Sequence, residues 1–370
     1  MKNNVLFSIC SLGLGHATRS LPIIRKYLAN HNVYIISNGD ALNFLKGELE
    51  GSPIKFFTLQ DYPPLQRGRG LLYYLYLAHD FAVTTLIIKR ESDFVNKIVQ
   101  EYDIDWIISD GRCGSYSKQV PCYLISHQIR FMTPKILRIF QPLVDLFSIF
   151  MFSRFDGVLI PDYASPNNLA GRMSHNWITR HIRCHYIGIL SSYYDLGLEQ
   201  DIDYLFVVSG FLEEQKKSFV NALIKQSEEL PGKKVFVLGD TRQEFHKVDA
   251  EHNIETYFYA LGQKRLELFN RAKFIISRCG YTTVMDLVEM GKKGLLFPTK
   301  NQVEQEYLQK YLQKNKYFLT CDSETDFDLK KLLAADFPVT EFVPDWKTAQ
   351  SLTQLEEAVK HVRTRVASGS

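Results

Sequence analysis

Two residues of this chain have the type and position expected of a general base and its partner. His16 lies in the segment SLGLGHATRS, which follows the apolar run Val5–Cys10. A neutral histidine beside a carboxylate can accept a proton near pH 7. Asp110 follows another apolar run, 105–109, and could meet His16 if both runs are strands of one sheet. The structural alternatives are a histidine that bonds its own loop and an aspartate that forms a turn or a cap.

The segment around His16 is also suited to bringing backbone close to a ligand. Gly13 and Gly15 permit a tight turn, and the free N–H groups of a helix that begins there favour an anion or a polar substrate group. A dinucleotide site is an alternative, because Asp40 follows the next apolar run and could bind a ribose. Thr18 argues against that alternative, since it stands where the dinucleotide fingerprint has Gly or Ala.

A second group of polar residues lies in the segment FIISRCGYTTVMDL, residues 274–287, which reads as a strand, a glycine turn and a helix. The turn at Gly280 would place backbone N–H groups and the hydroxyls of Thr282 and Thr283 at a helix N-terminus, an arrangement that suits a diphosphate. Asp286 follows one helical turn later and could accept hydrogen bonds from a ribose. A capped helix with a solvated aspartate is the alternative.

Two further polar residues follow the next apolar run. Gln305 and Glu306 open a helical stretch after Gly294–Phe297. Amide and carboxylate groups at this place could hold the hydroxyls of a sugar by paired hydrogen bonds. The alternative is that both side chains are simply solvated on an early helical turn.

The elements that must position these residues alternate between short apolar runs and amphipathic helical stretches. In the first half the strand-like runs are Val5–Cys10, Val33–Ser37, Asp105–Ser109, Val120–Ile125 and Gly157–Ile160. In the second half they are Tyr204–Ser209, Lys234–Leu238, Ile254–Tyr257, Phe274–Ser277 and Gly294–Phe297. This alternation predicts parallel sheets that are covered by helices on both faces.

We therefore expect an α/β protein with two Rossmann-like domains that face a cleft. The irregular segment Ile187–Asp201 separates the two patterns and marks the linker. The first domain is predicted to span 1–188 and the second 189–345, and a final helix at about 346–366 is expected to pack back on the first domain. Ligands of such sheets bind outside the carboxyl ends of the strands.

The composition narrows the class of protein and its partners. The 370 residues include 44 Lys and Arg against 41 Asp and Glu, and a net charge of +3 gives no reason to expect nucleic-acid binding. The 6 cysteines are scattered and the N-terminus lacks a signal-peptide pattern, so we expect a reduced, cytoplasmic protein. We expect no cofactor and no metal, since there is no convincing DxD site and the ligand types of 181–185 lack a second pair.

Two stretches are unusually apolar, Leu71–Ile88 and Ile136–Phe152. Basic residues flank or interrupt them, among them Arg90, Arg138 and Arg154. Neither stretch is a clean membrane span. A basic and apolar face can nevertheless lie on an anionic bilayer, which would place the protein at the inner face of the membrane. Buried helices with solvated basic residues are the alternative.

Taken together, the segments SLGLGHATRS, SRCGYTTVMDLVEMG and LLFPTKNQVEQEYLQ resemble GT-B glycosyltransferases. The pattern is most similar to that of the N-acetylglucosaminyltransferase that completes the lipid-linked peptidoglycan precursor, and to its relatives. The resemblance spans most of the chain in element order, whereas the specific motifs cover a minority of the residues. It implies a nucleotide-sugar donor, usually uridine diphosphate, held by the C-terminal domain.

The resemblance also implies roles for individual positions. The stretch 258–262 would border the nucleobase, Asp286 stands where the family has a ribose-binding Glu, and Glu306 stands where a second Gln is common beside Gln305. The positions implied for donor binding are Ser209, Gly210, Arg278, Gly280, Tyr281, Thr282, Thr283, Asp286, Gln305 and Glu306. The positions implied on the acceptor side are Gly13, Gly15, His127 and Gln128.

The mechanism that the resemblance implies is inverting displacement without a metal, with His16 as the base and Asp110 orienting its ring. Related natural-product transferases pair a loop histidine with an aspartate in this way. The acceptor would be a small molecule or a lipid-linked sugar. Two other functions remain open: a nucleotide-sugar epimerase or hydrolase of the same architecture, and a non-catalytic nucleotide-sugar-binding protein.

Overall fold

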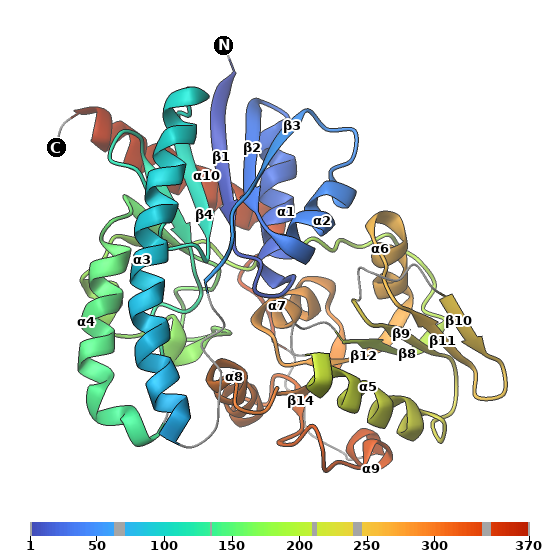
Figure 1. Ribbon diagram of the computed structural model, residues 1–370. Helices are drawn as coiled ribbons and strands as arrows, with labels where there is room; N and C mark the ends of the chain where they lie inside the picture. The colour runs from blue at the N-terminus through green and yellow to red at the C-terminus, as the bar shows by residue number, and fades with distance from the viewer. Residues whose placement is uncertain are drawn as a thin grey trace.

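The computed structural model describes residues 2–62, 71–133, 135–208, 213–239, 246–334 and 342–368. Within these residues the strands form two seven-stranded sheets, one in each half of the chain. Each sheet belongs to its own lobe, and the two lobes meet along α1, α2, α6 and α7 (Figure 1). The expected α/β architecture of two Rossmann-like domains is confirmed.

The first sheet is parallel throughout the pairs described and has the order β3-β2-β1-β4-β5-β6-β7. Its strands are β1 (Asn3–Ile9), β2 (His31–Ser37), β3 (Ile54–Thr58), β4 (Trp106–Asp110), β5 (Cys122–Ile125), β6 (Gly157–Ile160) and β7 (Cys184–Tyr186). The direction of the strand order reverses between β1 and β4, so the carboxyl ends of these two strands lie side by side at a topological switch point.

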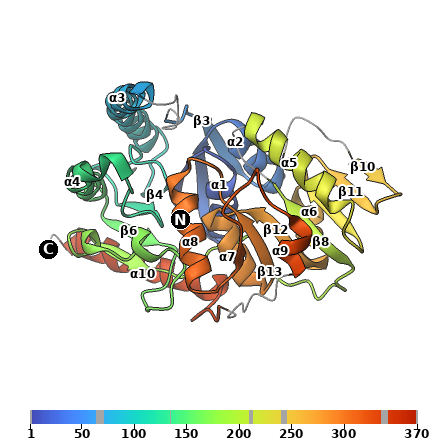
Figure 2. The ribbon, with the colours of Figure 1, turned by 90° about the horizontal axis from the view of Figure 1, so that it is seen from below.

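Helices cover both faces of the first sheet because successive side chains of a strand point to opposite faces. Phe7 and Ile108 belong to one apolar cluster with α1 and α2, whereas Leu6 and Ile107 belong to another with α3. The helices of this domain are α1 (Gly15–Leu28), α2 (Gly39–Glu48), α3 (Leu71–Glu101) and α4 (Gln141–Phe152). Seen from below, α3 and α4 lie on the side of the molecule opposite α5 and β10 (Figure 2).

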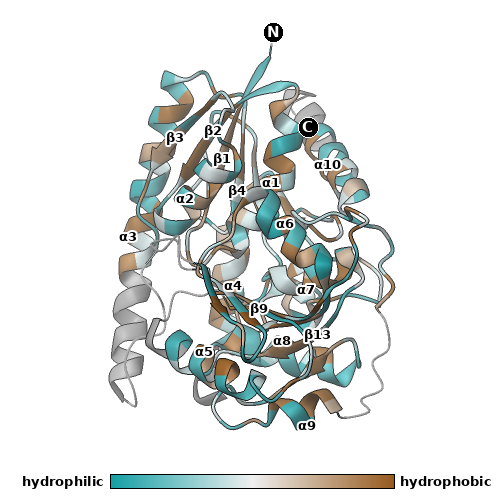
Figure 3. Cartoon of the chain, turned by 90° about the vertical axis from the view of Figure 1, so that its right-hand side faces the viewer, coloured by the Kyte–Doolittle hydropathy of each residue, from teal (hydrophilic) through white to brown (hydrophobic). Residues whose placement is uncertain are grey.

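The second sheet has the order β10-β11-β9-β8-β12-β13-β14 and is parallel except for the antiparallel pair β10–β11. Its strands are β8 (Ile202–Val207), β9 (Lys234–Val237), β10 (His246–Asp249), β11 (Ile254–Tyr257), β12 (Ala272–Arg278), β13 (Lys293–Phe297) and β14 (Leu319–Thr320). Its helices are α5 (Glu213–Ser227), α6 (Gly262–Arg271), α7 (Tyr281–Met290), α8 (Val303–Lys314) and α9 (Leu329–Ala334). The inner strands of both domains are largely hydrophobic and lie inside their helical layers (Figure 3).

The last helix, α10 (Thr348–Ser368), lies on the first domain (Figure 1). Leu355 and Val359 join the apolar cluster that contains α1, and the Tyr123 hydroxyl donates to the Val359 carbonyl over 2.9 Å. The chain therefore crosses between the lobes twice, once before β8 and once before α10. In the part of the chain that the structure describes, no helix is long and apolar enough to cross a membrane.

Candidate active site between the two domains

The structure places His16 and Asp110 in contact at the switch point of the first sheet. Asp110 is the last residue of β4, and His16 is the second residue of α1, just after β1. The His16 Nδ1 atom lies 2.7 Å from the Asp110 Oδ1 atom. Asp110 is 1% exposed and His16 24%, so the carboxylate is buried while the imidazole reaches the surface of the site.

Arg19, to which the sequence argument assigned no role, completes this group. Its Nε donates to the Asp110 Oδ2 atom over 2.8 Å, its Nη2 pairs with Oδ1, and the Ser20 hydroxyl donates to Oδ2 over 2.9 Å. Burial alone would raise the pKa of Asp110, but the charges of Arg19 and His16 hold that pKa well below its usual range. The carboxylate is therefore ionised and can only accept, so His16 points Nδ1–H toward Asp110 and leaves Nε2 free of that bond. Arg19 Nη2 also lies 3.0 Å from His16 Nδ1, but it cannot donate to a nitrogen that carries this hydrogen. The i, i+3 spacing from His16 could have indicated Arg19.

His127 connects this group to the second domain. Arg19 Nη1 lies 3.0 Å from His127 Nδ1, and His127 Nε2 lies 2.9 Å from Glu304 Oε1. A guanidinium can only donate, so Nδ1 accepts and Nε2–H donates to the carboxylate. Burial lowers the pKa of His127, which agrees with a neutral ring. The ring stacks on that of Tyr281, with 4.3 Å between the ring centres. The Gln128 carbonyl accepts a hydrogen bond from Ser126. The acceptor roles of His127 and Gln128 stay predictions.

The two glycine segments touch each other across the domain boundary. Gly13 has a φ of +83°, the left-handed conformation that its tight turn requires. Gly15 approaches Thr282 so closely that a Cβ at Gly15 would lie 3.0 Å from the Thr282 Oγ1 atom. The Thr282 hydroxyl donates to the Gly15 carbonyl over 3.1 Å. The predicted acceptor-side and donor-side turns are therefore direct neighbours.

The start of α7 lies at this boundary. Gly280 is the N-cap residue and provides no side-chain cap, so the first N–H groups of the helix have no partner from that position. Tyr281 is buried, and its hydroxyl donates to the Pro161 carbonyl over 2.8 Å. Its side chain is thus used for packing between the domains, and the predicted phosphate contact could come only from its backbone.

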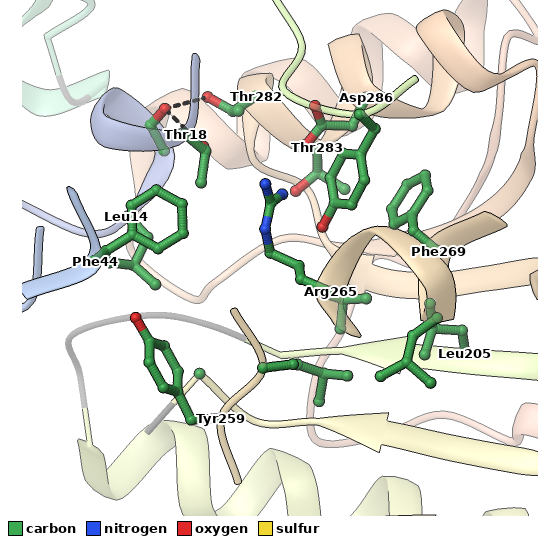
Figure 4. Close-up of a pocket in the computed structure, with 17 residues that line it drawn as sticks. Leu14, Thr18, Phe44, Leu205, Tyr259, Arg265, Phe269, Thr282, Thr283 and Asp286 are labelled. Atoms are coloured by element: carbon green, nitrogen blue, oxygen red, sulfur yellow. Dashed lines mark hydrogen bonds between the residues drawn. The ribbon is translucent and has the colours of Figure 1, made fainter. Parts of the chain in front are cut away.

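A pocket lies between the domains, beside these turns (Figure 4). Its cavity volume is about 100 Å³. The first domain and the linker contribute Leu14, Gly15, Thr18, Phe44 and Tyr193 to its lining. The second domain contributes Leu205, Val207, Val237, Gly239, Tyr259, Ala260, Arg265, Leu268, Phe269, Thr282, Thr283 and Asp286. The lining is mostly apolar with a few polar groups, which is typical of a small-molecule site.

Asp286 lies in this pocket, as its predicted donor role requires, but it is not solvated. It is 7% exposed, and the Ser191 hydroxyl donates to its Oδ1 atom over 2.6 Å. Burial raises the pKa of Asp286 to about 7, against the lowering effects of Ser191 and of the Arg265 charge. At neutral pH the carboxyl group is therefore protonated in a large fraction of the molecules.

Arg278 belongs to the predicted donor set, and its side chain is not among the described residues that line the pocket. Its donor role stays a prediction. The guanidinium is 9% exposed, pairs with Glu324 and lies 3.9 Å from the centre of the Phe219 ring. Burial lowers the pKa of Arg278 in spite of the Glu324 charge. Ser209 and Gly210 lie outside the described residues.

Gln305 and Glu306 bond the turn that precedes their own helix. Gln305 Oε1 accepts from the Thr299 N–H over 2.9 Å, and Glu306 Oε1 accepts from the Asn301 N–H over 2.9 Å. These bonds stabilise the connection between β13 and α8. Contacts from either side chain to a sugar stay predictions.

Arg265 and Tyr259 are pocket residues whose side chains the sequence argument did not select, although it placed 258–262 near a nucleobase through backbone contacts. No sequence signal marks Arg265, since it lies on α6 among other polar residues and its contacts come from α2 of the other domain. Among the described residues, no group of three or more His, Cys, Asp or Glu could hold a metal ion.

Comparison with known proteins agrees with this architecture. Residues 205–342 match the glycosyltransferase family 28 C-terminal domain. Over 321 residues the chain is 24% identical to an uncharacterized glycosyltransferase of Methanosarcina mazei, and the match covers 82% of each protein.

Solved structures show the same fold at low sequence identity. Arabidopsis thaliana UGT89C1, solved with UDP-L-rhamnose, superposes with a TM-score of 0.56 at 14% identity, covering 99% of this chain and 95% of that one. The spinosyn rhamnosyltransferase SpnG, solved with thymidine diphosphate, gives 0.56 at 14% identity, covering 100% of this chain and 99% of that one. Together these matches support a glycosyltransferase of GT-B architecture.

Proposed function

We propose that this GT-B glycosyltransferase takes its sugar from a nucleoside diphosphate donor bound at the start of α7 and transfers it to a hydroxyl that His16 deprotonates. The observation that carries the proposal is the contact of 2.7 Å between His16 and the buried, ionised Asp110, next to a turn that touches Thr282. A pyrimidine nucleotide is the donor class we favour, because two proteins of similar fold were solved with UDP-L-rhamnose and with thymidine diphosphate.

The proposed reaction is a single inverting displacement. The acceptor oxygen forms a bond to the anomeric carbon and gives its proton to His16 Nε2, while Asp110 stabilises the imidazolium that results. The bond between the anomeric carbon and the diphosphate oxygen breaks, and the diphosphate leaves with the electron pair. In this proposal, the N–H groups and the dipole of α7, with the hydroxyls of Thr282 and Thr283, stabilise the developing charge.

We further propose that the acceptor is presented at a lipid surface, because α4 and the turn that precedes it expose an apolar face. Ile139, Leu143, Leu146 and Phe150 follow at intervals of four, three and four residues and are 80%, 63%, 57% and 58% exposed. Scattered apolar side chains are normal on a protein surface, but a contiguous apolar stripe marks an interaction site. Lipid tails would bury this stripe on the domain that carries His16.

The charges around this stripe favour an anionic bilayer. Arg138 is exposed at its start, and the Arg154 guanidinium lies 4.4 Å from the Phe150 ring. Asp145, the one acidic residue of segment 135–154, is buried on the opposite face of α4 and paired with Arg130. Basic side chains beside a buried apolar face are attracted to anionic lipid headgroups.

A panel of nucleotides and nucleotide sugars tests the proposed function. A ligand that binds only the folded state raises the melting temperature. At a hundredfold excess over Kd it stabilises the folded state by about 2.7 kcal/mol. We expect uridine or thymidine diphosphates to stabilise the protein and adenosine diphosphate to have less effect. A stabilising nucleotide sugar is then incubated with and without hydroxyl acceptors, and the products are identified by mass spectrometry.

Transfer that requires an acceptor supports the proposal. Release of free sugar at the same rate without acceptor would indicate a hydrolase, and conversion of the nucleotide sugar into its epimer would indicate an epimerase. Binding without any turnover would leave a nucleotide-sugar-binding protein. No nucleotide binding at all would remove the proposal.

A further inference from the structure

Two polar atoms in the pocket lack hydrogen bonds. The Arg265 Nη1 atom and the Tyr259 hydroxyl are both buried, and neither has a hydrogen-bond partner among the described residues. Both residues line the same cavity. Buried polar groups of native proteins are nearly always bonded, so these two atoms can donate hydrogen bonds to a ligand that enters the cavity.

Arg265 is held in place by the first domain. Its Nε donates to Glu48 Oε1 over 3.2 Å, and Glu48 lies at the end of α2. The guanidinium carbon lies 4.4 Å from the centre of the Tyr193 ring and 5.6 Å from that of Phe44. The side chain is 10% exposed, and its guanidinium lies in the middle of the pocket, between Tyr259 and Thr283 (Figure 4).

The charge of Arg265 is only partly balanced. Glu48 also accepts from Arg25 Nη2 over 2.9 Å and from the Gly262 N–H over 2.8 Å, so one carboxylate is shared between two guanidinium groups. Asp286, the acid in the pocket lining, has its pKa raised to about 7 by burial and is protonated in a large fraction of molecules. A guanidinium can only donate hydrogen bonds, so a ligand that bonds Arg265 must supply an oxygen or nitrogen acceptor.

We infer that Arg265 and Tyr259 recognise the donor nucleotide by donating hydrogen bonds to its oxygen atoms. This inference rests on the proposed donor site and adds two specific contacts to it. The acceptor oxygen belongs either to the nucleoside or to the diphosphate, because both have oxygens that a guanidinium can bind. Glu48 is a positioning residue: it touches Arg265 from the opposite domain, so formation of this contact depends on the domains being closed.

The inference is tested by measuring the Kd of the full chain for UDP and for uridine by calorimetry. Arg265→Met should weaken UDP binding by tenfold or more, because it removes a charged donor from a buried site. Tyr259→Phe should weaken it by about threefold to tenfold, since only one hydroxyl is lost. Glu48→Gln, which touches no ligand, should weaken it less than Arg265→Met. The matched control is Arg271→Met, which removes an arginine of the same helix that pairs with Asp201 outside the pocket.

The outcomes separate this inference from the proposed function. If the parent protein binds UDP and Arg265→Met binds it within threefold of the parent, the recognition role is wrong while the donor site stands. If the parent binds no nucleotide, both are wrong. If Arg265→Met loses affinity equally for uridine and UDP, the acceptor oxygen belongs to the nucleoside. If it loses affinity for UDP alone, the acceptor oxygen belongs to the diphosphate. Either result supports the inference. If Arg265→Met fails to fold, Arg265→Lys and Tyr259→Phe decide the question by the same measurement.

Discussion

At the residue scale, the Asp110 carboxylate accepts hydrogen bonds from three side chains. It accepts from His16, from Arg19 through both of its oxygens, and from Ser20. A histidine–aspartate pair alone would leave the buried carboxylate with a single cationic partner. Here Arg19 supplies a permanent charge that keeps Asp110 ionised whatever the protonation state of His16. The base can therefore gain and lose its proton without a change in the ionisation of its partner.

His16→Ala should lower kcat by about 10²-fold to 10⁴-fold, the range typical of a general base. Donor affinity should change little, because His16 is not among the described residues that line the pocket. The measurement is steady-state turnover with the donor identified by the nucleotide panel. His252→Ala, which removes a surface histidine bonded to Asp249, serves as the control and should retain kcat within about twofold. A turnover of His16→Ala within about threefold of the parent would remove the catalytic role.

Asp286 should make the stability of the protein depend on pH. Its pKa is about 7 in the folded protein against an ordinary value of 3.8 for an aspartate, so between these values the folded state binds up to one more proton than the unfolded state. Stability then falls as pH rises through this window, by at most about 1.4 kcal/mol per pH unit from this group. Asp286→Asn keeps an oxygen acceptor for Ser191 and should lack this contribution.

The measurement is the free energy of unfolding in urea at pH 5, 6, 7 and 8 for both proteins. The stability of Asp286→Asn relative to the parent should increase with pH up to about 7 and then level off. Parallel stability curves would show that Asp286 is ionised in the folded protein at all of these pH values.

At the element scale, the packing between the two chain crossings depends on a glycine. Gly188 is buried with a φ of +81°, and a Cβ there would lie 2.1 Å from Trp346 Nε1 and 2.6 Å from Ser351 Oγ. The Trp346 indole N–H donates to the Ile187 carbonyl over 3.1 Å. The linker before β8 and the segment that leads into α10 are therefore packed directly against each other.

Gly188→Ala should lower the free energy of unfolding by about 3 kcal/mol or more, since a left-handed backbone and an overpacked contact add up. Gly197→Ala is the matched control in the same linker: its φ is +63°, and no atom lies within 4 Å of the added Cβ in the described structure. Gly197→Ala should lower the free energy of unfolding by about 1 kcal/mol, because only the left-handed backbone conformation opposes it. Equal losses in urea unfolding for the two variants would show that the Trp346 contact carries no steric constraint.

Most elements follow from local patterns and could be predicted. The apolar runs at Val5–Cys10 and Phe274–Ser277 correspond to β1 and β12, because strands of a covered parallel sheet are apolar on both faces. The four edge strands β3, β7, β10 and β14 were not predicted. In β10, for example, the four residues HKVD are mostly polar and exposed, and among the described strands it pairs with β11 alone. Edge strands are less completely covered, so they lack the continuous apolar pattern of the inner strands.

The candidate site was predictable where it follows strand ends and unpredictable where it depends on pairing between distant segments. His16 and Asp110 could be found because each follows an apolar run. Arg265 could not, since its partner Glu48 is 217 positions away and on the other domain. The pairing of Arg278 with Glu324 is likewise a tertiary contact that local pattern does not contain.

At the scale of the whole molecule, the apolar face of α4 and the interdomain pocket belong to different surfaces. The helix α4, which carries most of the stripe, lies on the first domain, on the side away from α5 and β10 (Figure 2). A protein attached to a bilayer through α4 would keep its second domain, with the donor side of the pocket, toward water. A water-soluble nucleotide sugar and a lipid-borne acceptor could then reach His16 from different sides.

The triple variant Leu143→Ser, Leu146→Ser, Phe150→Ser should lose at least tenfold in affinity for vesicles that contain anionic lipid, because it removes most of the apolar area offered to the bilayer. Sedimentation with phosphatidylcholine vesicles, with and without phosphatidylglycerol, measures this partition, and the parent should bind more tightly when the anionic lipid is present. Val248→Ser with Val343→Ser is the control, since these valines are 59% and 69% exposed but isolated on the second domain. The membrane role would be wrong if the parent protein bound neither kind of vesicle. It would also be wrong if the parent formed dimers that the triple variant could not form, and in either case the stripe would be assigned to a protein contact.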